Sequence, residues 1–118
     1  MKYVMLINDD PDQWDAIPEE QVKQDYEAIY AYVEKWRERG KWADQGNQLD
    51  HPRTARTIRH NGTAPVVTDG PFTDTKEVVG GYMVLDAVDL DEAVAIASEW
   101  PTLHYGGSIE VRPIVEMP

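Results

Sequence analysis

The chain has 118 residues, of which 42% are hydrophobic, and this size and composition predict a single globular domain over residues 1–118 with its own core. Its 22 Asp and Glu outnumber its 11 Lys and Arg, and the formal net charge of −11 argues against nucleic acid or an anionic membrane as a partner. Cysteine is absent, which excludes disulfides and thiolate metal sites. The sequence has neither a signal-peptide pattern nor an apolar run of membrane-spanning length, so we expect a cytoplasmic protein.

The first third of the chain predicts a buried strand, an acidic loop and a long helix. Residues 3–7 are all apolar, which favours a strand buried on both faces. We expect residues 9–17 to form a loop, whose four aspartates lack the spacing of a calcium-binding loop. Apolar residues then recur at helical spacing between Pro18, a residue suited to a first helical position, and Gly40, which is suited to a helix end.

The middle of the chain predicts a weak strand and a hairpin. Residues 41–49 indicate an irregular strand. Two extended segments, Arg53–His60 and Ala64–Thr68, flank Asn61-Gly62, a dipeptide typical of a two-residue hairpin tip. We expect the arginines of this segment to protect an exposed hairpin edge.

The last third predicts a strand, a helix and an edge strand. Residues 78–86 are almost continuously apolar, and Gly80-Gly81 would allow a bulge. Asp89 and Glu92 have the spacing of a capping box, and Pro101 ends the helix that follows. Residues 108–115 alternate polar and apolar, and a proline among them favours an edge position.

This element order predicts an α+β fold, namely a ferredoxin-like βαββαβ unit with an inserted β-hairpin. Two helices cover only one face of such a sheet, yet residues 3–7 and 82–85 are apolar on both faces. The simplest cover for the second face is another copy of the chain, so we expect a homodimer.

A family resemblance agrees with this architecture. Asp69-Gly70-Pro71-Phe72, followed by Lys76-Glu77, resembles the signature of the DGPF domain family, part of the wider YCII-related group. The resemblance covers nearly the whole chain, including the ending at residues 107–113. It implies one DGPF/YCII-related domain that forms a dimeric α+β barrel, within a family that is largely uncharacterised.

The signature turn supplies the first candidate site residues. Gly70-Pro71 permits a sharp change of direction, which we expect to deliver Phe72 into the core. Because Pro71 has no N–H, Asp69 lacks the usual Asx-turn donor, and its carboxylate is left for the Phe72 N–H, solvent or a ligand.

Barrels of this kind commonly hold a cavity between the sheet faces, where a desolvated carboxylate can act as a base. We expect that role from one of the three carboxylates near it, and substrate contacts from four other side chains. The catalytic candidates are Asp69, Glu77 and Glu110, and the substrate-binding candidates are Phe72, Lys76, His104 and Arg112.

Several features limit this interpretation. Glu110 and Arg112 lie two apart on one strand face, where they could form a carboxylate-binding site or a structural salt bridge. The three histidines are scattered and none has metal-ligand spacing, so we expect neither a metal nor a cofactor. YCII-like relatives have been proposed to use a His–Asp pair, but the corresponding step here is Trp100-Pro101 and the first strand ends at Asn8, without histidine.

Two functions from different classes remain open. The first is a cofactor-free enzyme that acts on a small organic substrate by acid–base chemistry. The second is a non-catalytic small-ligand binding or regulatory protein linked to sigma-factor signalling, because some family members are encoded beside extracytoplasmic-function sigma factors.

Overall fold

A four-stranded antiparallel sheet forms the body of the protein. The computed structural model describes residues 1–72 and 76–118. The strand order is β2-β5-β1-β6, and all neighbouring strands are antiparallel. The strands are β1 (Lys2–Asp9), β2 (Trp42–Gln48), β5 (Val78–Asp86) and β6 (Ser108–Pro113). The predicted α+β class is therefore confirmed, and so is the edge position of the last strand.

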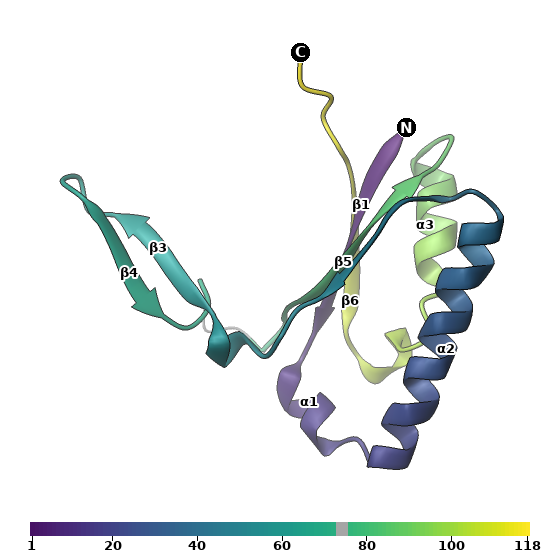
Figure 1. Ribbon diagram of the computed structural model, residues 1–118, viewed down its shortest axis with the longest axis horizontal. Coiled ribbons are helices and arrows are strands. Elements are labelled where there is room, and N and C mark those ends of the chain that lie inside the picture. Colours follow the sequence, from purple (N-terminus) through teal and green to yellow (C-terminus); the bar gives the residue numbers. More distant parts are fainter. Residues whose placement is uncertain (73–75) are drawn as a thin grey trace.

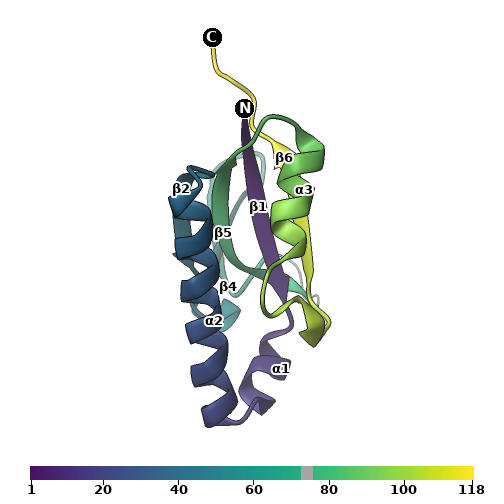
Figure 2. The ribbon, with the colours of Figure 1, turned by 90° about the vertical axis from the view of Figure 1, so that its right-hand side faces the viewer.

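Helices cover one face of this sheet. The long helix α2 (Glu19–Glu38) and the shorter α3 (Leu90–Ser98) lie side by side against it (Figures 1 and 2). A short helix, α1 (Pro11–Ala16), and two single 3₁₀ turns, η1 (Pro52–Thr54) and η2 (Leu103–Tyr105), complete the helical elements of the described residues. None of the helices described combines the length and apolar composition needed to cross a membrane.

The core lies between the sheet and α2 and α3. Tyr3, Met5 and Ile7 alternate along β1 and are buried, as are Met83 and Leu85 of β5. Because successive strand side chains point to opposite faces, these residues all belong to the helix-covered face.

The other face of the sheet has no cover within one chain. Val4, Leu6, Tyr82 and Val84 alternate with the core residues and are only half-buried. Burial of both faces was predicted for these strands, and in the single chain only one face is buried. The two central strands, β1 and β5, thus present apolar side chains on the uncovered face.

A hairpin arm projects from the body on the side away from the helices (Figure 1). It consists of β3 (Arg56–His60) and β4 (Pro65–Asp69), so the predicted hairpin is confirmed. Its predicted two-residue tip is wrong, because His60 pairs with Pro65 and residues 61–64 form the connection. The arm carries exposed apolar side chains, including Ile58 and Val67.

Capping side chains explain where the short helices begin. The loop predicted for residues 9–17 is wrong, since residues 11–16 are helical. The Asp10 carboxylate accepts a hydrogen bond from the Asp12 N–H at 3.0 Å, and Pro11 takes the first helical position. At α3 the predicted cap is confirmed, because the Asp89 carboxylate accepts from the Glu92 N–H at 2.8 Å.

Candidate functional site

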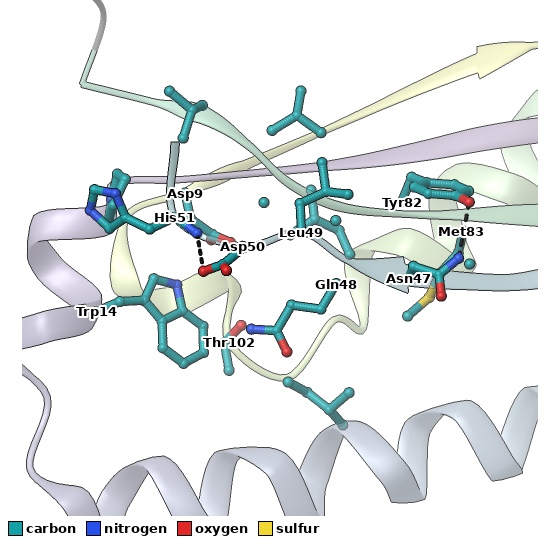
Figure 3. Close-up of a pocket in the computed structure, with 18 of the residues that line it drawn as sticks. Asp9, Trp14, Asn47, Gln48, Leu49, Asp50, His51, Tyr82, Met83 and Thr102 are labelled. Carbon is teal, nitrogen blue, oxygen red and sulfur yellow. Dashed lines mark hydrogen bonds between the residues drawn. The ribbon is translucent and has the colours of Figure 1, made fainter. Parts of the chain in front are cut away.

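A cavity of about 590 Å³ opens at the end of the sheet where β1 finishes and β5 begins. Helices α1 and α2 line it on one side and the segment after β2 lines it on another. Figure 3 shows Asp9, Trp14, Asp50 and His51 grouped at one end of the cavity, with Asn47 and Tyr82 at the other. Its volume is typical of a pocket for a small organic molecule.

Asp9 enters this cavity from the end of a central strand. It is the last residue of β1 and lies opposite Val78 in the ladder. The β1–β5 register slips between Ile7 and Asn8, which leaves Gly80 as the extra residue of a bulge. The predicted bulge at the two glycines is therefore confirmed, and it lies beside Asp9.

Two glycines make room for the Asp9 carboxylate. A Cβ at Gly80 would lie 2.9 Å from one carboxylate oxygen, and a Cβ at Gly107 would lie 3.0 Å from the other. A side chain at Gly80 would displace the carboxylate, and one at Gly107 would also meet the carbonyl oxygen of Asn8 at 2.5 Å. The glycines therefore fix where its charge can sit.

The surroundings of Asp9 disfavour its charged form. Burial raises the pKa of the Asp9 carboxyl above its ordinary value of 3.8, and the negative charge of Glu77 adds to the rise. A hydrogen bond from the Trp14 side chain lowers the pKa in part. A half-buried carboxyl with a raised pKa can exchange protons closer to neutral pH than an exposed one.

Aromatic side chains of α1 and α2 line the cavity, together with an amide side chain at the end of β2. The rings of Trp14 on α1 and Tyr26 on α2 lie 6.4 Å apart between centroids, and Tyr26 stacks on Tyr30 at 6.3 Å. The Tyr26 hydroxyl is hydrogen-bonded to the side-chain amide of Gln48 at about 3 Å. This contact ties α2 to the end of β2.

The segment after β2 carries the other polar groups. The Asp50 carboxylate accepts a hydrogen bond from the His51 backbone N–H at 2.7 Å (Figure 3). The His51 Nδ1 accepts one from the Arg53 N–H at 3.0 Å. These two hydrogen bonds hold the turn that carries Asp50 and His51.

None of the seven site residues predicted from the sequence lines this cavity. Asp69 ends β4 on the arm, where its exposed carboxylate lies 3.6 Å from Nε of Arg56. The predicted burial of Phe72 is wrong: the side chain is 70% exposed, and the Arg59 guanidinium lies over its ring at 5.0 Å. Phe72 turns outward because it follows the projecting arm rather than the core. Residues 73–75, within the signature turn, lie outside the described residues.

The other predicted residues are spread over the surface. Glu110 and Arg112 form an ion pair on the uncovered face of β6, and both are exposed. His104 is exposed in η2 beside Tyr105. Lys76 and Glu77 are exposed just before β5, although the charge of Glu77 acts on Asp9.

Sequence reasoning missed Asp9, and the reason is identifiable. Asp9 was assigned to an acidic loop and considered only as a calcium ligand. The signal that could have found it was the Gly80-Gly81 pair, because bulges often lie next to active sites. Among the described residues there is no group of three or more His, Cys, Asp or Glu side chains arranged to hold a metal ion.

Replacing Asp9 by asparagine should stabilise the protein at neutral pH. The folded-state pKa of Asp9 is raised, so the folded chain retains a proton that the unfolded chain releases, and stability falls as pH rises through the folded pKa. Asp9→Asn removes this loss and keeps the size and shape of the side chain. Its melting temperature should exceed that of the wild type at pH 7, and the advantage should disappear below about pH 4.

The matched control is Asp12→Asn, which removes the same charge from an exposed position on α1. It corrects for the gain in stability that follows from any reduction of the net charge of −11, because fewer negative charges repel one another. A fall in melting temperature for Asp9→Asn at pH 7 would show that the charged carboxylate is stabilising, contrary to this argument.

Comparison with known proteins identifies the family. The model of the YCII-related domain matches residues 1–118. An uncharacterized protein of Rhizobium meliloti (strain 1021) is 33% identical over 118 residues, an alignment that covers 97% of this chain and 92% of the relative. The predicted family is confirmed. The chain belongs to the YCII-related domain family.

Proposed function

We propose that this YCII-related protein is an enzyme that transfers a proton on a small organic substrate without a cofactor, with Asp9 as the base. The observation that carries the proposal is a half-buried carboxyl of raised pKa inside a cavity of small-molecule size. Asp9 replaces Asp69, Glu77 and Glu110 as the preferred base, because those three side chains do not line the cavity.

The mechanism follows from the position of Asp9. A substrate in the cavity would present an acidic C–H, N–H or O–H to the carboxylate, which takes the proton and becomes a neutral acid. Burial favours that neutral product. The protonated carboxyl then returns the proton to another atom of the substrate or to water.

A protein that binds a small ligand without converting it is the second candidate. The wall built by Trp14, Tyr26 and Gln48 favours it, because aromatic rings and an amide bind ligands but do not exchange protons near neutral pH. The two candidates share the cavity and differ in the role of Asp9.

Loss of turnover in Asp9→Asn tests the proposal. Purified wild type, Asp9→Asn and Asp12→Asn would each be incubated with a panel of small organic molecules, and conversion followed by mass spectrometry and by proton exchange from deuterated water. We expect conversion by the wild type and by Asp12→Asn, and a rate roughly 100-fold to 10,000-fold lower for Asp9→Asn. Equal rates for wild type and Asp9→Asn would exclude Asp9 as the base, and binding without any conversion would favour the second candidate.

We infer further that the sheet and its helices form a ferredoxin-like unit and that two units pair into a dimeric α+β barrel. The strand order β2-β5-β1-β6 is that of a split βαβ arrangement, and the uncovered face carries half-buried Val4, Leu6 and Val84. A second copy that covers this face would bury on the order of 2,000 Å² or more in total.

Analytical ultracentrifugation tests the dimer. The wild type should sediment as a dimer at low micromolar concentration. Leu6→Glu places a charge on the uncovered face and should abolish pairing, whereas Val94→Glu, at an exposed position of α3, should not. A folded wild-type monomer under these conditions would contradict the inference.

A further inference from the structure

Acidic side chains line the cavity, and basic Lys and Arg side chains of the described residues do not. Asp9, Asp15 and Asp50 line it, and the negative charge of Glu77 reaches Asp9. Among the described residues that line it, none is Lys or Arg. An anionic ligand would meet repulsion on entering, and a cationic ligand would meet attraction.

Aromatic rings lie beside these carboxylates. Trp14 and Asp9 line the same end of the cavity (Figure 3), so a group that reaches the carboxylate also reaches the indole. Tyr26 extends the aromatic wall away from Trp14. Faces of aromatic rings attract cations, and Trp does so most strongly. A carboxylate next to aromatic rings is therefore suited to an organic ammonium ion.

The remaining lining suits an apolar body. Ile7 and Ile29 reach the cavity from the sheet and from α2, and Trp100 reaches it from beyond α3. A cavity of about 590 Å³ has room for an organic molecule well beyond a bare ammonium ion. A hydrated metal ion would leave these apolar side chains without a contact.

We propose that the cavity binds an organic amine in its protonated form, with the ammonium group against Asp9 and Trp14 and an apolar body along Ile7 and Ile29. This inference rests on the same cavity as the proposed function and names its substrate class. Neither the acidic side chains nor the aromatic rings alone would specify an organic ammonium ion. The position of Asp9 beside Trp14 combines the two kinds of contact that such an ion prefers.

Binding of three matched probes tests the proposal. Benzylammonium, benzyl alcohol and benzoate share a phenyl ring and differ in charge, and their binding to the 118-residue chain would be measured by calorimetry at pH 7. We expect benzylammonium to bind at least about tenfold more tightly than benzyl alcohol, and benzoate to bind most weakly of the three. Benzoate binding as tightly as benzylammonium, or no binding of benzylammonium at about 10 mM, would overturn the proposal.

Variants separate the site from the general negative charge of the chain. Asp9→Asn should lower the affinity for benzylammonium at least about tenfold and leave the affinity for benzyl alcohol nearly unchanged. Trp14→Leu should weaken benzylammonium more than Trp14→Phe, which keeps an aromatic face. Asp12→Asn removes an equal charge outside the cavity. It should change neither the affinity for benzylammonium nor the affinity for benzyl alcohol. If Asp12→Asn weakened benzylammonium as much as Asp9→Asn, the attraction would be long-range and the proposal wrong.

The two proposals can fail separately. Selective binding of benzylammonium together with no conversion of any amine would refute the enzyme and leave the ammonium site standing. Turnover that depends on Asp9 but uses only neutral or anionic substrates would refute the ammonium site and leave the enzyme standing.

Discussion

Gly46→Ala should be among the most destabilising single substitutions in this chain, with an expected cost of about 2–5 kcal/mol. Gly46 has φ +71°, a left-handed conformation that costs a residue with a Cβ about 1–2 kcal/mol. Its Cβ would also lie 1.6 Å from the carbonyl oxygen of Tyr82, which is backbone and cannot rotate away. Forcing the two strands apart adds about 1–3 kcal/mol.

The close approach at Gly46 has a structural cause. The β2–β5 register slips between Asp44 and Asn47, so residues 45–46 bulge against β5. The Asp44 carboxylate accepts a hydrogen bond from the Gly46 N–H at 2.8 Å and holds the turn. The bulge lies at the edge of the cavity, and an alanine there would disturb the ladder and the site together.

Gly40→Ala is the matched control. Gly40 has φ +69°, almost the same conformation, but no atom within 4 Å of the Cβ it would gain. Gly40→Ala should therefore cost only the free energy of placing a Cβ in the left-handed conformation, about 1–2 kcal/mol. Chemical denaturation of both variants at one protomer concentration gives the comparison. Equal costs would mean that the strands adjust freely at Gly46, contrary to the geometry.

The sequence predicted the elements whose signals are local. Residues 78–86 form β5 with the predicted bounds. An apolar run between polar residues identifies a strand without any information from distant parts of the chain. The α3 start was predictable for the same reason, since Asp89 caps a backbone N–H three residues away. The hairpin was also predicted, although the length of its connection was not.

Features that depend on distant parts of the chain were not predicted. Phe72 was expected in the core because the Gly70-Pro71 turn was expected to direct it there, but the arm carries it away from the body. Asp9 could not be identified as a site residue from its neighbours alone, because its environment comes from Gly80, Gly107 and Trp14. Helix α1, which carries Trp14, was hidden by its short length and its acidic composition.

Tyr32→Ala should destabilise the protein by about 3–5 kcal/mol, because it removes the ring that joins three elements of the core. Tyr32 is 5% exposed on α2. Its ring meets Trp100 edge-on at 5.3 Å between centroids and lies 5.9 Å from Trp42 on β2. Its hydroxyl donates a 2.7 Å hydrogen bond to the carbonyl oxygen of Ile96 on α3.

Tyr32→Phe separates the ring from the hydroxyl. It keeps the aromatic contacts and loses one hydrogen bond, at a cost of about 1 kcal/mol. The Ile96 carbonyl oxygen still accepts from the Glu99 N–H at 3.3 Å, so it does not become an unsatisfied buried acceptor. Denaturation followed by tryptophan fluorescence would measure both variants, since Trp36 and Trp100 lie against this ring. If Tyr32→Phe cost as much as Tyr32→Ala, the hydrogen bond to α3, rather than ring packing, would be what holds the two helices together.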